Sequence, residues 1–185
     1  LQKEQAFVTV GVDAPPMGDE ARYAMEVLKA ILSGQGGRLF YELRDRESLA
    51  YSVYASMLHG LDAGAFMINI GTSPEKIEQA VGGIFGEIER LLEEPPSDAE
   101  LERAKRYLIG SHDIGLQRNS SRAMAFTLDE LYGFGYQRTL GYSDRVAGVT
   151  TDDIIRLVRS YFDLDRAVVA VTKPPGVEPD LGAYR

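Results

Sequence analysis

The chain has 185 residues, a formal net charge of −8 and no cysteine. A chain of this length is expected to form one domain that buries roughly 70% of its unfolded surface. The missing cysteines exclude disulfides and thiolate zinc sites, and the acidic balance argues against nucleic acid and anionic membrane surfaces as partners. No apolar run approaches the ~20 residues that cross a bilayer, and no signal-peptide pattern opens the chain.

The sequence begins at Leu1 rather than at a methionine. We therefore expect residues 1–185 to be a single domain cut from a longer chain, with any targeting segment outside it. The first predicted strand, residues 6–12, is apolar on both faces and should lie in the interior of its sheet. A helix should follow from Gly18 or Asp19 and stop at Gly34, because glycine enters the left-handed region freely.

A short charged helix is predicted next, over residues 38–46, with Leu39 and Leu43 facing the core. It runs directly into a strand, so the junction can bring Arg44 and Tyr51 together. Strands are expected over residues 51–58 and 65–70, and the short glycine-containing loop between them favours an antiparallel hairpin.

The second half of the chain is predicted to be mostly helical. Ser73, followed by Pro74 and by the acidic Glu75 in the first turn, should cap a helix that ends at Pro95. Ser97 with Glu100 forms a capping-box pattern for the next helix. Further elements are expected at residues 119–131 (helix), 150–162 (helix) and 167–172 (strand), with residues 150–153 as the cap of the last helix. Because the helices cluster rather than alternate with strands, this order predicts an α+β fold with a mostly antiparallel sheet.

Complete catalytic motifs are missing from the sequence. His59 and His112 form neither H-x-x-E-H nor H-E-x-x-H, and a zinc site would need both of them plus a carboxylate from elsewhere. We expect His59 to be a polar group of the hairpin loop and His112 to lie on a helix surface. The glycine-rich turn at residues 34–37 follows a helix and lacks the Gly-Lys-Ser/Thr of a phosphate loop.

Four segments, in order, resemble the non-catalytic half of the pitrilysin family. These inverzincin zinc metallopeptidases include insulin-degrading enzyme and the mitochondrial processing peptidase. The segments that carry the resemblance are residues 26–32, 38–53, 70–76 and 100–105. The similarity extends from Gln5 to about Lys173.

The resemblance implies an antiparallel sheet covered by helices, as in the processing-peptidase fold. Family members pair a zinc-bearing domain with similar metal-free domains, and the halves close around an unfolded peptide. This chain would be a metal-free, substrate-binding domain that is inactive alone, with zinc held by a catalytic partner domain or subunit. The resemblance also allows a dimer, and it implies the bacterial periplasm or cytoplasm as the compartment.

The family's non-catalytic half carries an Arg and a Tyr seven positions apart, which match Arg44 and Tyr51 here. By resemblance, both would contact the substrate backbone near the partner's zinc. A tyrosine hydroxyl can donate to a carbonyl oxygen as it becomes an oxyanion, and arginine presents fixed planar donors. Arg38 and Arg46 flank the same helix and could replace Arg44 in this contact, but both are expected to be surface charges.

Other interpretations remain open. The chain could be a structural subunit of the same fold, as in the core proteins of respiratory complexes, with no peptide chemistry. It could also be a stand-alone metal-binding enzyme. The hairpin over residues 51–70 could pair its edge with an extended peptide, although an ordinary covered edge is the simpler expectation.

Overall fold

The computed structural model describes residues 5–34 and 36–184. Its four strands form one antiparallel sheet in the order β2-β3-β1-β4. The strands are β1 (Ala6–Ala14), β2 (Ser52–Leu58), β3 (Gly64–Thr72) and β4 (Val168–Thr172). Together with the clustered helices, this sheet confirms the predicted α+β fold.

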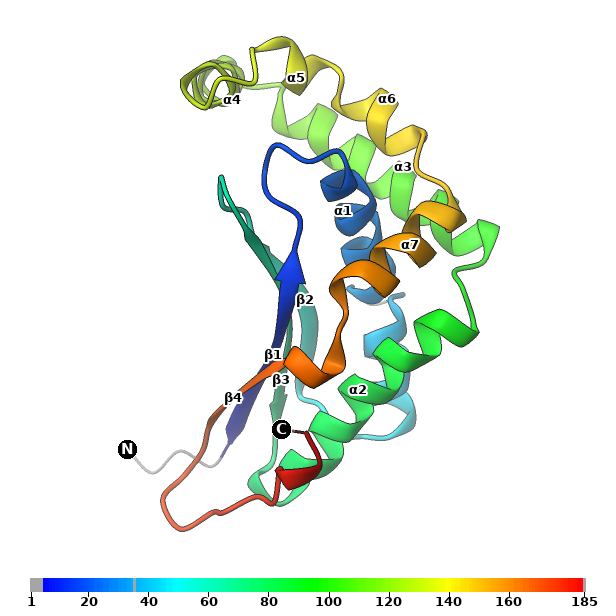
Figure 1. Cartoon of the computed structure of the whole chain (residues 1–185), viewed down its shortest axis with the longest axis vertical. Coiled ribbons are helices and arrows are strands. Elements are labelled where there is room, and N and C mark those ends of the chain that lie inside the picture. The colour runs from blue at the N-terminus through cyan, green and yellow to red at the C-terminus, as the bar shows by residue number, and fades with distance from the viewer. Residues whose placement is uncertain (1–4, 35, 185) are drawn as a thin grey trace.

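The helices cover one face of the sheet and leave the other face open (Figure 1). Helices α1, α2 and α7 contact the strands, and α3 packs against α1 and α6 on the outer side. The longer helical elements are α1 (Ala21–Leu32), the π-helical η1 (Phe40–Arg46), α2 (Ile77–Glu93), α3 (Asp98–Gly115), α4 (Asn119–Leu131) and α7 (Thr151–Tyr161). The short ones are η2 (Pro74–Lys76), α5 (Gln137–Leu140), α6 (Tyr142–Ala147), η3 (Leu164–Arg166) and η4 (Gly182–Tyr184).

The core lies between the sheet and the inner helices. Val8 and Val10 of β1 are fully buried there, because every second side chain of a strand points to the same face. β1 pairs with β3 on one side and β4 on the other, which confirms its predicted interior position. The strand continues two residues beyond its predicted end, since Asp13 and Ala14 still pair with β3.

The predicted caps form complete capping boxes at two helices, and the third is confirmed in position only. Ser97 and Glu100 form a reciprocal capping box at the start of α3, and Thr150 does the same with Asp153 at the start of α7. Ser73 is the N-cap residue of the 3₁₀ turn η2, with Pro74 at the start of the turn as predicted, but its side chain makes no cap hydrogen bond. The α-helix α2 begins after this turn, at Ile77.

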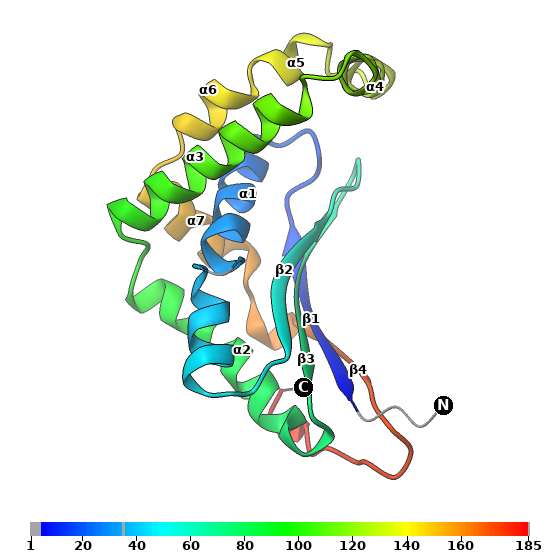
Figure 2. The same cartoon turned by 180° about the vertical axis from the view of Figure 1, so that it is seen from behind.

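Helix α4 has no buried side chain. In two opposite views it lies beyond the tip of the β2–β3 hairpin, on the side toward which the open face of the sheet looks (Figures 1 and 2). Exposed apolar side chains on it include Met124 and Leu131. Among the described residues, no helix has the length and the apolar run that a bilayer crossing requires.

Candidate functional site: a groove on the open face of the sheet

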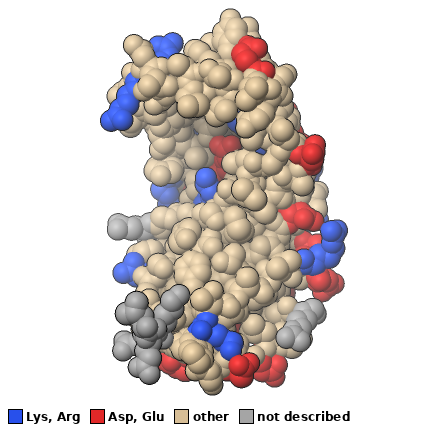
Figure 3. Space-filling view, turned by 90° about the vertical axis from the view of Figure 1, so that its left-hand side faces the viewer, with Lys and Arg blue, Asp and Glu red and all other residues tan. Residues whose placement is uncertain are grey.

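The open face of the sheet is poor in charge. Figure 3 looks onto this side of the molecule, and most of the visible surface there is free of charged side chains. The strand register shows which residues point to the open face of the sheet. They are Phe7, Thr9, Gly11 and Asp13 of β1; Ser52, Tyr54, Ser56 and Leu58 of β2; Ala65, Met67, Asn69 and Gly71 of β3; Val168, Ala170 and Thr172 of β4. Asp13 alone among them carries a charge, and it lies 3.4 Å from Arg166.

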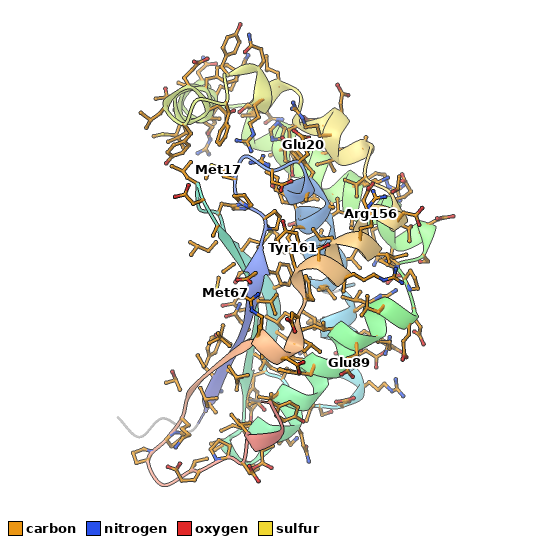
Figure 4. All side chains as sticks on the ribbon, in the orientation of Figure 1. Met17, Glu20, Met67, Glu89, Arg156 and Tyr161 are labelled. Atoms are coloured by element: carbon orange, nitrogen blue, oxygen red, sulfur yellow. The ribbon has the colours of Figure 1, made fainter. Side chains whose placement is uncertain are left out.

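A short polar chain crosses the middle of this face. Thr9 donates to Asn69 Oδ1 at 3.0 Å, and Asn69 Nδ2 donates to Ser56 Oγ at 2.9 Å. Asn69 is buried, so these bonds satisfy an amide that would otherwise be costly to enclose. The chain therefore stabilises the sheet and leaves apolar side chains, such as Met67, as the contact surface around it (Figure 4).

A cavity of about 900 Å³ opens at one end of this face. We call it the groove. It is lined by Gln5, Ala6, Phe7, Tyr51, Ser52, Gly71, Ser73, Pro74, Glu75 and Thr172. A Cβ atom on Gly71 would lie 2.9 Å from Ser52 Oγ, so glycine keeps the floor of the groove low where an extended chain could approach the sheet.

Tyr51 stands on the wall of the groove with 61% of its surface exposed. Its amide donates to the Gly71 carbonyl at 2.8 Å, which fixes the backbone. The strand was predicted to begin at Tyr51, but β2 begins at Ser52. Tyr51 therefore lies outside the strand, and its ring does not join Val53 in the core.

The loop before Tyr51 is held on both sides. Ser48 adopts a left-handed φ of 54°, a conformation that is uncommon for a residue other than glycine. Lys76 donates to the Ser48 carbonyl at 2.9 Å, and Thr72 Oγ1 donates to the Leu49 carbonyl at 2.5 Å. These bonds join the end of η1 to β3 and to the start of α2, so the turn that presents Tyr51 is fixed by its neighbours.

Arg44 lies on η1 with its side chain exposed. Its guanidinium carbon is 4.6 Å from the centre of the Phe40 ring, a cation–π contact. In the described parts of the chain it forms no ion pair, and no hydrogen bond joins it to Tyr51. The predicted helix-to-strand junction is confirmed, with Leu39 and Leu43 buried as expected, but the segment is a π-helix.

Glu42 anchors η1 to α2. Its carboxylate is buried and lies 2.8 Å from Arg46 and 3.2 Å from Arg90, which also reaches Glu87 at 3.1 Å. Burial alone would raise the pKa of Glu42, but the bonds from Arg46 and Arg90 hold it below its ordinary value. Burial raises the pKa of Glu87. This network fixes the position of the helix that carries Arg44.

Arg38 corrects an expectation. The sequence indicated a surface charge, yet only 12% of its side chain is exposed, and it forms a two-pronged ion pair with Glu100 at 2.7 and 3.0 Å. The hydrogen bonds that the Glu100 carboxylate accepts from Arg38, together with those from Ser97 at the helix cap, lower its pKa to about 2. Arg46 is exposed as expected and pairs with Glu42.

The outer edge of β2 is occupied at its midpoint. The Ala55 amide donates to Ser33 Oγ at 2.7 Å, and Ser33 Oγ donates back to the Ala55 carbonyl at 3.4 Å. A peptide could not add to this edge as a continuous strand without displacing Ser33. We therefore interpret the outer edge of β2 as covered by Ser33 and not as a site where a peptide adds a strand.

The two histidines have separate structural surroundings. His59 lies in the hairpin loop as predicted, half-buried, and burial lowers its pKa. His112 is not a plain surface residue, because it stacks on Tyr142 at 4.2 Å and lies 3.1 Å from the Thr139 carbonyl. Across residues 5–34 and 36–184, no three His, Asp or Glu side chains gather as metal ligands would. These residues do not fit a zinc ion, and we derive no zinc chemistry from them.

A second cavity, of about 830 Å³, lies on the helical side between α1, α6 and α7. Glu20, Arg156 and Tyr161 mark it in Figure 4. Its charged wall is already paired, since Arg145 lies 3.3 Å from Glu20 and Arg156 contacts Asp153. The groove combines polar with apolar lining residues, and none of the ion pairs among the described residues involves its lining, so it is the stronger candidate site.

Comparison with known proteins identifies relatives along most of the chain. Residues 1–108 match a family model described as "Peptidase M16 inactive domain". An uncharacterized zinc protease of Streptomyces coelicolor is 33% identical over 158 residues, which cover 84% of this chain and 34% of that protein. One of Mycobacterium bovis is 30% identical over 179 residues, covering 96% of this chain and 41% of that protein.

Solved structures share the fold. A peptidase M16 inactive domain from Pseudomonas fluorescens matches with a TM-score of 0.85 and 22% identity, covering 97% of this chain and 43% of the other. A protease from Helicobacter pylori matches with a TM-score of 0.84 and 23% identity, covering 93% of this chain and 42% of the other. The chain spans well under half the length of the curated relatives named above.

Proposed function

Because the chain belongs to the peptidase M16 inactive-domain family, we propose that it forms one wall of the substrate chamber of a zinc metallopeptidase. In this proposal residues 1–185 are a single metal-free domain of a longer assembly, in the bacterial periplasm or cytoplasm. The zinc and the water that it activates belong to a catalytic partner domain or subunit of the same family. The substrate is an unfolded peptide that lies along the open face of the sheet.

Tyr51 carries this proposal. It combines three properties that a substrate contact needs: an exposed hydroxyl, a backbone fixed by the Gly71 carbonyl, and a place on the wall of the groove. Its hydroxyl donates to the carbonyl oxygen of the scissile peptide as negative charge develops there. One preorganised donor of this kind changes rate by about 10²–10³.

Arg44 has a supporting role in the proposal. Its guanidinium is exposed and unpaired among the described residues, while η1 is fixed by the buried Glu42. A planar guanidinium presents fixed donors that can bond to peptide carbonyl oxygens, or in parallel to both oxygens of a carboxylate. Arg44 therefore holds the substrate backbone while Tyr51 contacts the reacting carbonyl.

The open face suits a chamber wall. Its apolar side chains and scarce charge allow sequence-tolerant contact with an unfolded peptide, and α4 extends the wall with further exposed apolar residues. Domain closure over such a surface would remove water from the substrate and strengthen the polar contacts to it. Neither effect requires the chain to contain a metal ligand.

The test is to compare the complete peptidase with the same protein lacking this chain. The zinc-bearing part alone should keep its zinc but lose peptide hydrolysis, and adding the purified chain should restore part of it. Full hydrolysis by the zinc-bearing part alone would contradict the proposal. A structural subunit of the same fold is the second candidate, and it would be favoured if no polypeptide in the assembly carried H-x-x-E-H.

A further inference from the structure

Among the described residues that line the groove, Glu75 alone carries a charge. Every other polar group that lines it is neutral, whether amide, hydroxyl or phenol. Glu75 lies in the turn η2 with its side chain exposed, directly after Ser73 and Pro74 on the groove wall. A single carboxylate in an otherwise neutral groove gives the whole site a negative potential.

Two described cations adjoin the groove in sequence, and both are bound elsewhere. Lys76 directs its ammonium group to the Ser48 carbonyl at 2.9 Å, and Lys173 pairs with Glu178 at 2.9 Å. Glu75 itself forms no ion pair within the described residues. Its carboxylate is therefore available to a cation that arrives with a ligand.

The carboxylate is ionised at neutral pH. A hydrogen bond from Ser73 and another from its own backbone amide lower the pKa of Glu75, and the nearby charge of Lys76 lowers it further. Lys76 does not replace a ligand cation, because its ammonium group is already directed to Ser48.

We propose that Glu75 is a specificity-determining residue that selects peptides presenting an ammonium group to the groove. The ammonium belongs either to a lysine side chain or to the amino terminus of the peptide. This inference rests on the proposed function, since it takes a peptide in the groove as given. Phe7 and Pro74 supply apolar surface for the methylene stem of a lysine, while its charged end reaches Glu75.

The experiment is an NMR titration of the isotopically labelled chain with four short peptides. Three are capped at both ends and differ at one position, which is lysine, norleucine or glutamate. The fourth contains norleucine and has a free amino terminus. Amide shifts of Gly71 and Thr172, on the groove, report binding.

We expect a capped lysine peptide to bind about threefold more tightly than the norleucine peptide, the range of an exposed ion pair, and high salt to remove the difference. A similar gain for the peptide with a free amino terminus would identify the amino terminus as a source of the ammonium group. Glu75→Gln should abolish the gain of every ammonium-bearing peptide over capped norleucine. Glu89→Gln is the matched control, because Glu89 is exposed on α2 and lines a different cavity (Figure 4).

Equal affinity of the unaltered chain for the lysine, norleucine and glutamate peptides would overturn the role of Glu75 and leave peptide binding intact. A charge preference that survives Glu75→Gln would also overturn it. If no peptide shifts the groove amides, both this inference and the proposed peptide contact fail.

Discussion

Arg38 and Glu100 are 62 positions apart in the chain, yet they form a two-pronged ion pair that joins the start of η1 to the first turn of α3. The pKa of Glu100 is about 2, below its value of about 4.3 in an unfolded chain. The pair therefore stabilises the fold fully above about pH 4.3, and this contribution is lost as the pH falls toward about 2.

Arg38→Ala should raise the pKa of Glu100 toward its ordinary value and lower the free energy of unfolding at neutral pH by about 2 kcal/mol. NMR titration of the Glu100 carboxyl and urea denaturation measure the two effects. The stability difference from the unaltered chain should shrink as the pH falls. Arg106→Ala, at an exposed position of α3, is the control. An unchanged Glu100 pKa in Arg38→Ala would contradict the assignment.

Glu42→Gln tests the anchor of η1. The substitution removes the negative charge that lies beside the partly buried Arg90. We therefore expect the free energy of unfolding to fall by about 3 kcal/mol. Asp45→Asn removes an exposed charge from the same helix and should change stability by less than about 0.5 kcal/mol. Urea denaturation compares the two variants, and equal stability for both would show that the network does not hold η1 in place.

Ser33→Ala tests the occupied edge of β2. It removes the partner of the Ala55 amide, so we expect a loss of about 1 kcal/mol and faster hydrogen exchange at that amide. The same change at the exposed Ser111 of α3 should have neither effect. Unchanged exchange at Ala55 in Ser33→Ala would mean that water or another group satisfies this edge.

The sheet and the main helices could be predicted from the sequence because their signals are local. Short apolar runs identified β1 and β4, and the Ser97 and Thr150 capping boxes were recognisable from residues three positions apart. Helices α5 and α6 gave no such signal. They are positioned by distant contacts, for example the bond of 2.6 Å from the Tyr142 hydroxyl to Glu26.

The candidate site was predictable only in part. Arg44 and Tyr51 came from the family resemblance, and their own spacing does not distinguish them from surface residues. Glu75 was read only as part of a helix cap, because nothing local reveals that β1 brings Phe7 beside it. Arg38 was assigned to the surface because its partner lies on another helix.

The most direct test of the account is the kcat of the complete peptidase carrying Tyr51→Phe, measured beside Tyr54→Phe. Tyr54 is the matched control, since it is also partly exposed and lies on the open face three residues further along. We expect Tyr51→Phe to lower kcat by about 10²-fold with zinc content and Tm nearly unchanged, and Tyr54→Phe to have little effect. A Tyr51→Phe enzyme with the kcat of the unaltered protein would contradict the claim that this domain donates to the substrate.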